Sequence, residues 1–257
     1  MEKQSSLVKT FHILEILAEE RALGISHVTA RTGYPAATVH RILNTLAEMG
    51  YVHQNTEDRK YLLGLNILKL ARSLVDDLDI VSVSRPIMRT LMQETRETVN
   101  LVVFDRDEAV YVEQVNDSRS MLRMFTKVGA RVPLYCTGVG KTYLAGMNEA
   151  DFQAYLHRVD MTPLTARTLV REEDLRQELE EVRRQGYARD KEEVEEGVAC
   201  VSAAIFHRGL VIGGLSISGP STRISDRTAP VLGPKVQEAA ALISAHLDEL
   251  NNPVLFG

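Results

Sequence analysis

The chain has 257 residues, of which 44% are hydrophobic, and its formal net charge at pH 7 is −5. This length suits one large domain or two ordinary ones, and the two cysteines, Cys136 and Cys200, are too few for a disulfide framework, so we expect free thiols. No apolar run approaches the ~18 residues of a membrane-spanning helix, and the N-terminus lacks the apolar core of a signal peptide, so we expect a soluble, cytoplasmic protein with no membrane partner.

Three helices are expected in the first fifty residues. Apolar residues recur at helical spacing from Leu7 to Leu17, after Ser5 or Ser6 as the N-cap. A second helix over 25–32 ends at Gly33, and a third, PAATVHRILNTLAEMG, begins with a proline and ends with a glycine, as helices commonly do. The third helix has an apolar face, and its outer face carries the polar residues Thr38, His40, Arg41, Asn44 and Thr45.

A hairpin signature follows the third helix, since YVHQNTEDRKYLLG places two short extended runs around the turn-forming NTED. Three short helices and a hairpin predict a winged helix-turn-helix over residues 1–64. Such a third helix fits the major groove of double-stranded DNA, while Arg59 and Lys60 on the wing would contact phosphate or the minor groove. A small helical protein-interaction module remains the alternative.

The charge distribution agrees with this assignment. Residues 1–72 hold nine Lys/Arg against seven Asp/Glu, whereas the remainder holds 21 against 28. A mildly basic front and an acidic back suit a DNA-facing domain on an acidic body, although many other proteins share this asymmetry. An amphipathic helix, LNILKLARSLVDDL, follows the hairpin, and we assign residues 65–79 as a linker helix that packs on a partner, such as the same helix of a second subunit.

Residues 80–257 alternate strand-like and helical segments, which predicts an α+β domain with an antiparallel sheet flanked by helices. Strands are expected at TVNLVVFD, AVYVEQV, MLRMFTKV, 198–206 and LVIGGLSISG. Helices are expected at 86–97, from near Gly140, and at 149–158, 172–185 and 226–250. The loop GARVPLYCTGVG leads into the second of these helices.

The stretch CTGVGKT resembles the end of a phosphate-binding P-loop, but Tyr135 occupies the position of the first required glycine, so we exclude a nucleoside-triphosphate site. What remains is a helix that begins at small residues, whose free N–H groups and positive dipole end favour an anion. An ordinary tight entry into a helix explains this segment equally well.

Two further features suggest polar groups around a cavity. In GGLSISG, Ser216 and Ser218 are two residues apart on a strand and share a face, where their hydroxyls could bind a small polar ligand or simply face solvent. In YARDKEEVEEGVACVSAAIF, five acids within seven residues precede an apolar strand around Cys200. They could mark a metal site, a catalytic acid pair, the rim of a ligand cup or a solvated turn.

Catalytic and metal sites are disfavoured. The histidines make no metal-ligand spacing, although Asp190, Cys200 and His207 could converge in space. No histidine is evidently paired with either cysteine as an enzyme nucleophile would require. We therefore expect no enzyme activity, no catalytic residue, no metal and no cofactor, with a small-molecule enzyme or a zinc-binding sensor as the alternatives.

The whole chain resembles the IclR family of bacterial transcriptional regulators, on the basis of PAATVHRIL, ETVNLVVFD, MLRMFTKVGARVPLYCTGVGKTYLA, GYARDKEEVEEGVACVSAAIF and GLSISGPSTRIS. The resemblance implies a winged helix that reads an operator, a GAF-like C-terminal domain that binds a small metabolite, and a homodimer or homotetramer. It implies a regulator of a catabolic operon, expected here to be a repressor. Ala36 and Ala37 replace a polar pair frequent in relatives, so no relative's DNA sequence preference carries over.

The resemblance also implies an effector cup. The N–H groups of Gly138 and Val139 would receive a carboxylate, the polar wall would be Asp190, Cys200, Ser216 and Ser218, and the apolar wall would be Met121, Met124, Val132 and Val198. Asp190 would repel an anion, so it should accept a hydrogen bond from a hydroxyl or a water. The expected effector is a small organic acid, either a 2-oxo acid or a sugar acid, for example ketodeoxygluconate or glyoxylate. Glu192, Glu193, Glu195 and Glu196 are expected on a solvated loop near the mouth.

Overall fold

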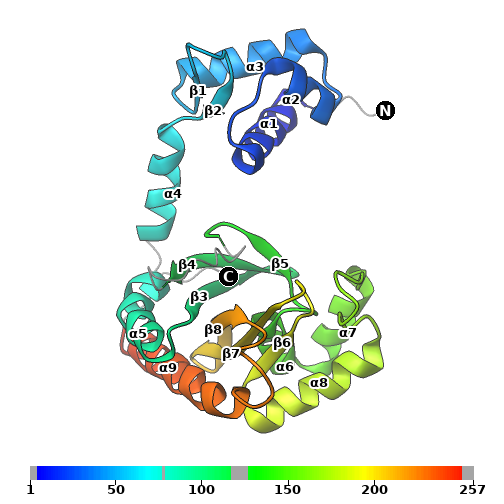
Figure 1. Cartoon of the computed structure of the whole chain (residues 1–257), viewed down its shortest axis with the longest axis vertical. Coiled ribbons are helices and arrows are strands. Elements are labelled where there is room, and N and C mark those ends of the chain that lie inside the picture. Colours follow the sequence, from blue (N-terminus) through cyan, green and yellow to red (C-terminus); the bar gives the residue numbers. More distant parts are fainter. Residues whose placement is uncertain (1–4, 77–78, 117–126, 251–257) are drawn as a thin grey trace. The chain divides into compact units, whose positions relative to one another are not determined.

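The computed structural model describes residues 5–76, 79–116 and 127–250, and it divides into two compact units, 1–75 and 76–257 (Figure 1). The predicted helices and hairpin of the first unit are all present. Its elements are α1 (Ser6–Glu20), α2 (Ile25–Thr32), α3 (Ala36–Glu48), β1 (Val52–Gln54), β2 (Tyr61–Leu63) and α4 (Asn66–Asp76). None of the described helices in either unit is long and apolar enough to cross a membrane.

Local sequence signals set these boundaries. The Ser5 side chain accepts a hydrogen bond from the Val8 N–H and caps α1, and Gly33 ends α2 in the left-handed conformation that glycine adopts without steric cost. β1 and β2 pair antiparallel with Val52 opposite Leu63. The core of the unit joins all three helices to the hairpin through Ile13, Leu17, Val28, Val39, Leu43, Val52 and Tyr61.

The second unit is built on a six-stranded antiparallel sheet in the order β5-β4-β3-β8-β7-β6. Its strands are β3 (Thr98–Asp105), β4 (Glu108–Val115), β5 (Arg131–Pro133), β6 (Ala188–Lys191), β7 (Val198–His207) and β8 (Leu210–Pro220). Its helices are α5 (Asp79–Thr95), α6 (Gly138–Gly146), α7 (Glu149–Arg158), α8 (Glu172–Gln185) and α9 (Ala229–Glu249). This is the expected α+β architecture.

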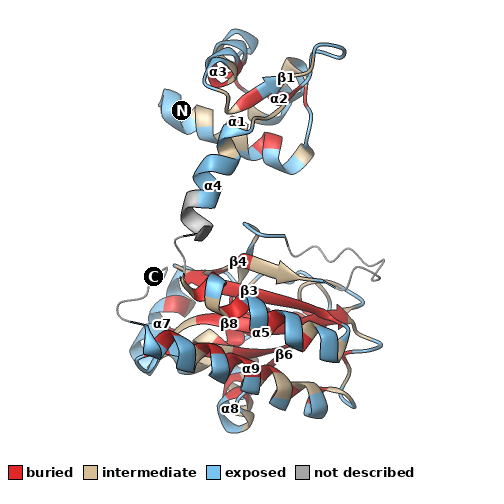
Figure 2. Ribbon diagram, turned by 90° about the vertical axis from the view of Figure 1, so that its left-hand side faces the viewer, coloured by how far each residue is buried: buried red, intermediate tan, exposed pale blue. Residues whose placement is uncertain are grey.

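Helices cover both faces of this sheet, and buried residues dominate its central strands β3 and β8 (Figure 2). Two adjacent glycines of β8 identify the layers. A Cβ on Gly213 would lie 2.9 Å from Ile80 Cδ1 of α5, whereas a Cβ on Gly214 would lie 3.2 Å from Val139 of α6. α5 and α9 therefore lie on one face with each other, and α6 lies on the opposite face.

Besides small shifts of one to three residues at other ends, one helix start and two short strands differ from the expectation. α5 begins at Asp79 rather than at residue 86, with Pro86 inside the helix. The added turns bury Ile80 and Val81, and this burial offsets the ~3 kcal/mol cost of an internal proline. β5 and β6 lie in segments read as irregular, because three or four residues become a strand only through pairing with β4 and β7. Most of the strand expected at 121–128 lies outside the described residues.

Candidate functional site

A cavity of about 100 Å³ lies on the α6 face of the sheet. We call it the cup. Its described lining comprises Tyr111, Ala130, Val132, Thr137, Val139, Asp190, Val194, Glu195, Val198, Cys200, Ser216 and Ser218. The volume is well below the ~300 Å³ at which pockets for drug-sized ligands begin, so the cup suits only a small molecule.

The N-terminus of α6 forms one wall of the cup. Thr137 is the N-cap, and its Oγ1 accepts a hydrogen bond from the Gly140 N–H at 3.1 Å. The N–H groups of Gly138 and Val139 lie in the first turn of α6, where no carbonyl of the helix can accept a hydrogen bond from them. A Cβ on Gly138 would collide with Ser202 Oγ and approach Cys200 Sγ to 2.8 Å, and a Cβ on Gly140 would collide with the Leu134 backbone. Gly138 therefore lets the helix end approach β7, and Gly140 lets it approach the backbone of the loop that follows β5.

The paired serines face the cup, as expected, and they are buried on a central strand. Asn100 of β3 lies beside them, directly opposite Ser216 in the strand register, and its Nδ2 donates to Ser216 Oγ at 3.2 Å and to Ser218 Oγ at 3.1 Å. Gln114 of β4 donates in turn from Nε2 to Asn100 Oδ1 at 2.9 Å. The polar wall of the cup is thus the end of a hydrogen-bond chain that crosses three strands.

A carboxyl and a thiol lie beside the serines on the same face of the sheet, since Cys200 pairs directly with Ser218. Asp190 of β6 lies directly opposite Cys200 of β7, and both are buried. Burial raises the pKa of Asp190 to about 7 and the pKa of Cys200 to about 11. Asp190 Oδ1 accepts a hydrogen bond from the Glu193 N–H at 2.7 Å. The carboxyl is therefore oriented by its own turn and titrates near neutral pH.

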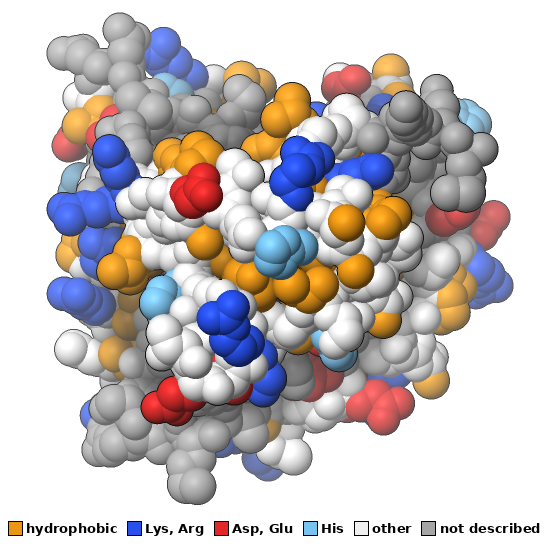
Figure 3. All heavy atoms as spheres, turned by 90° about the horizontal axis from the view of Figure 1, so that it is seen from above, with side chains coloured by type: hydrophobic (Ala, Val, Ile, Leu, Met, Phe, Trp, Pro, Cys, Tyr) orange, Lys and Arg blue, Asp and Glu red, His pale blue; other side chains and the backbone are white. Residues whose placement is uncertain are grey.

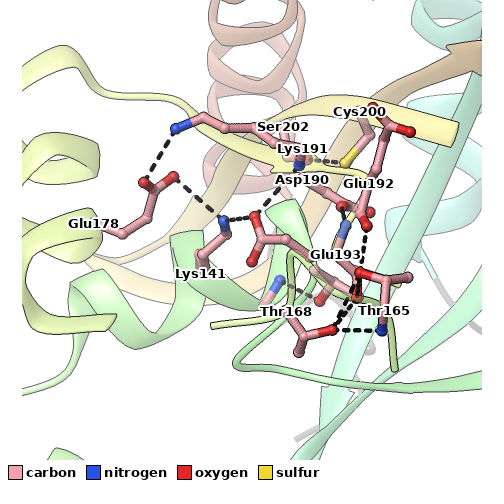
Figure 4. Close-up of polar contacts among 12 residues, drawn as sticks. Lys141, Thr165, Thr168, Glu178, Asp190, Lys191, Glu192, Glu193, Cys200 and Ser202 are labelled. Carbon is pink, nitrogen blue, oxygen red and sulfur yellow. Dashed lines mark hydrogen bonds and ion pairs between the residues drawn. The ribbon is translucent and has the colours of Figure 1, made fainter. Parts of the chain in front are cut away.

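One acidic residue contradicts the expectation of a solvated loop. Glu193 is buried, and its Oε1 lies 2.6 Å from Nζ of Lys141, which is completely buried in α6 (Figure 4). Glu178 of α8 lies 3.3 Å from the same ammonium. Burial opposes the charge on Lys141, but the two carboxylates outweigh it and raise its pKa. The charge pattern alone could not reveal this pair, because the lysine comes from a distant helix.

The segment after β6 is also anchored through its backbone. Thr168 Oγ1 donates to the Glu193 carbonyl at 2.6 Å, and Thr165 Oγ1 donates to the Glu192 carbonyl at 2.7 Å (Figure 4). Val194 and Glu195, which come next, line the cup. The buried ion pair and the two threonines therefore hold the turn that forms this side of the cup.

The structure brings most of the expected cup residues together. Val132, Val139, Asp190, Val198, Cys200, Ser216 and Ser218 line the cavity, and Gly138 abuts Cys200 beside it. Met121 and Met124 lie outside the described residues. Sequence reasoning missed Tyr111, Ala130, Thr137, Val194 and the supporting Asn100, and it placed Glu195 near the mouth of the cup but not in its lining. An asparagine inside the apolar strand TVNLVVFD was a usable signal, because a buried amide requires partners.

The first unit exposes the polar face expected for α3. Val39, Ile42, Leu43 and Leu46 are buried on its inner side. The outer residues His40, Arg41, Asn44 and Thr45 are exposed and Thr38 is half-buried. Arg59 and Lys60 are exposed at the tip of the hairpin, where Lys60 lies 3.2 Å from Asp58.

An apolar groove of about 460 Å³ lies between α1, α3 and α4 of the same unit. Its lining includes Leu7 and Phe11, which are 72% and 62% exposed although they continue the apolar pattern of α1. Figure 3 shows hydrophobic side chains at the surface of this unit, among Lys, Arg and His side chains. The apolar pattern of α1 thus divides into a buried half and an exposed half.

The structure separates the three residues considered for a metal. Asp190 and Cys200 are neighbours, but His207 lies at the far end of β7, with Nδ1 2.8 Å from Asp248 Oδ1. Within residues 5–76, 79–116 and 127–250, no three His, Cys, Asp or Glu side chains form a group that could hold a metal ion.

Comparison with known proteins matches both units. The family model described as "Bacterial transcriptional regulator IclR C-terminal" matches residues 72–245, and that of the "IclR helix-turn-helix domain" matches residues 6–56. The HTH-type transcriptional regulator KdgR of Escherichia coli (strain K12) is 38% identical over 244 residues, which cover 95% of this chain and 92% of KdgR. The transcriptional repressor IclR of the same organism is 33% identical, covering 91% and 87% of the two chains.

A solved structure agrees with these matches. The Thermotoga maritima IclR structure superposes with a TM-score of 0.80 at 29% identity, covering 95% of this chain and 98% of that one. The relatives are transcriptional regulators rather than enzymes. The chain accordingly belongs to the IclR family of bacterial transcriptional regulators, which bind DNA through the N-terminal helix-turn-helix.

Proposed function

We propose that α3 is the recognition helix and that Thr38, His40, Arg41, Asn44 and Thr45 contact the operator, with Arg59 and Lys60 on the adjoining backbone or minor groove. The exposure of these side chains on one face of α3 and on the hairpin supports this assignment. An arginine that neutralises one phosphate or reads one guanine contributes measurably to affinity.

The assignment is tested with double-stranded DNA selected from a random-sequence pool by the wild-type chain. Arg41→Ala should weaken binding at least about tenfold and reduce the salt dependence of the affinity by about one ion. Lys69→Ala, which removes the same charge from α4, is the matched control. If Arg41→Ala leaves both the affinity and its salt dependence unchanged, α3 is not the recognition helix.

We further propose that the cup binds a small carboxylate effector, a 2-oxo acid or a sugar acid of the kind that ketodeoxygluconate and glyoxylate represent. The supporting observation is the convergence of three groups on one cavity of about 100 Å³: the N-terminus of α6, two serine hydroxyls and a carboxyl that can be protonated. The helix end suits the effector carboxylate. The serines and Asp190 suit the oxygen atoms beside it.

A thermal-shift screen against 2-oxo acids, 2-hydroxy acids and sugar acids tests this site. A ligand at a hundred times its dissociation constant stabilises the folded chain by about 2.7 kcal/mol, which gives a readable shift. The shift should disappear in Asp190→Ala and persist in Glu196→Ala, which removes an exposed carboxylate from the same segment. A shift that survives Asp190→Ala would place the ligand elsewhere.

The sign of regulation and the assembly are also proposals. The chain is proposed to act in the cytoplasm as a repressor of a catabolic operon, in line with the repressor IclR at 33% identity. We propose a homodimer or homotetramer in which the groove of the first unit contacts a second copy, because large exposed apolar patches mark interaction sites. Repression is tested with a promoter fused to a reporter, which should be silent with the chain and active when the effector is added.

A further inference from the structure

Asn100 is a buried polar residue next to the cup that is not part of its lining. It lies near the middle of β3 with no solvent exposure, between Gln114 on β4 and Ser216 on β8. It lies beside the two serines that face the cavity and donates a hydrogen bond to each of them, but it is not among the described lining residues. Ser216 and Ser218 are therefore the lining residues through which Asn100 acts on a ligand.

The Asn100 amide is the inner end of a chain of three amide side chains that begins at Asn116. Asn116 Nδ2 donates to Gln114 Oε1 at 2.9 Å, and Gln114 Nε2 donates to Asn100 Oδ1 at 2.9 Å. An amide has one acceptor oxygen and one donor nitrogen. Because the oxygen of Asn100 is taken by Gln114, its NH2 group faces the serines and supplies one hydrogen to each.

This arrangement determines whether the serine hydroxyls donate or accept hydrogen bonds toward the cavity. Each hydroxyl oxygen accepts a hydrogen bond from Asn100, so the O–H proton of each serine remains for another partner. The two hydroxyls lie 3.4 Å apart, which is longer than the usual ~2.7–2.8 Å of an O–H···O bond. Both protons are thus available to a ligand, and this wall of the cup is a pair of donors.

We propose that Asn100 is the positioning residue for effector specificity: oriented by Gln114, it makes both serine hydroxyls donors and so selects acids with an acceptor oxygen beside the carboxylate. This inference rests on the proposed function of the cup as the effector site. A wall of donors suits both a keto and a hydroxyl oxygen, whereas a wall of acceptors suits only the hydroxyl, because a keto oxygen cannot donate a hydrogen bond.

Two substitutions should turn the serine hydroxyls from hydrogen-bond donors toward the cup into acceptors. In Asn100→Asp, a carboxylate oxygen replaces the NH2 group and accepts from the serines, whose lone pairs then face the cup. In Gln114→Glu, the carboxylate cannot donate to Asn100, so the Asn100 amide turns over and presents Oδ1 to the serines. Position 114 is only partly buried, so Gln114→Glu carries the test even if Asn100→Asp fails to fold.

Gln114→Lys is the matched control, because an ammonium group keeps a donor against Asn100 Oδ1 and so preserves the direction of the chain. The probes are pyruvate and lactate, which share three carbons and a carboxylate and differ in the keto and hydroxyl oxygen. Their dissociation constants are measured by isothermal titration calorimetry for the wild type and the three variants. The ratio of the two constants cancels the effect of any added charge, because both probes are monoanions.

The ratio of the pyruvate constant to the lactate constant should rise about tenfold in Asn100→Asp and Gln114→Glu, since lactate can turn its hydroxyl to donate and pyruvate cannot. In Gln114→Lys it should stay within about twofold of the wild type. If the wild type binds both acids and the ratio is unchanged in both reversing variants, the role of Asn100 is wrong and the effector site stands. If the wild type binds neither acid, this inference and the 2-oxo acid form of the proposed effector fail together, whereas the thermal-shift screen still tests the sugar acids.

Discussion

At the residue level, Asp190 combines burial with a place in the lining of the cup, the proposed site for an anionic effector. Its pKa of about 7 lies well above the ordinary aspartate value of ~4, chiefly because burial disfavours the charge. Protonation below pH 7 would remove the like charge and turn the carboxyl into a donor. The cup is therefore expected to bind anionic effectors more tightly at pH 6 than at pH 8.

The same shift predicts a pH dependence of stability. Between about pH 4 and pH 7 the folded chain holds a proton on Asp190 that the unfolded chain has lost, so this residue's contribution to stability declines as the pH rises through that window. Asp190→Asn, which still accepts from the Glu193 N–H, should abolish this component. Thermal unfolding from pH 5 to pH 8 measures it, with the exposed Glu196→Gln as the control. Superimposable pH profiles of wild type and Asp190→Asn would contradict the assignment.

The stability of the fold is also expected to depend on the buried ion pair between Lys141 and Glu193. Lys141→Met would leave Glu193 buried without its cation, which typically costs about 3–5 kcal/mol of unfolding free energy. Adding Glu193→Leu should recover most of the loss, because it removes the unpaired charge. Lys191→Met is the matched control, since this exposed lysine pairs with Glu178 and should cost less than about 1 kcal/mol. Denaturant unfolding distinguishes the cases, and equal losses for the two lysines would refute a buried pair.

At the element scale, α6 depends on its N-cap both for stability and for the geometry of the cup. Thr137→Ala removes the acceptor of the Gly140 N–H and should cost about 1 kcal/mol, together with effector affinity. Asn148 is the corresponding N-cap of α7, and its side chain accepts a hydrogen bond from the Asp151 N–H. Asn148→Ala should lower the unfolding free energy by a similar amount without changing effector binding. Chemical denaturation and titration calorimetry read the two effects. Equal effector affinities in the two variants would show that the α6 cap does not affect the geometry of the cup.

Elements that depend on local signals were predictable, and those that depend on partners were not. The bounds of α2, α7 and α8 follow from caps, glycine stops and apolar spacing that are all local in sequence. β5 and β6 are three and four residues long and carry no periodicity that could be recognised. The first turns of α5 lie before Pro86, and a proline is typical of the first turn of a helix, so sequence reasoning placed the helix start there. Packing of Ile80 against the sheet extends the helix to the N-terminal side of the proline.

At the scale of the whole molecule, the exposed apolar surface of the first unit predicts self-association. Phe11→Glu introduces a charge into the groove and should shift the chain toward the monomer. Leu210→Glu changes a comparably exposed residue in the second unit, 71% exposed, and serves as the control. Sedimentation velocity across a concentration series measures the shift. A Phe11→Glu chain that assembles like the wild type would exclude the groove as the subunit contact.

Periodicities, caps and motifs are local properties of the chain, and they were enough to predict the winged helix-turn-helix, the antiparallel α+β plan, the shared face of Ser216 and Ser218, and the family. The burial of Glu193 against Lys141 and the support of the serines by Asn100 became evident only from the folded chain. These contacts join residues about fifty and more than a hundred positions apart. Strand register and helix packing create them, and no local pattern encodes either.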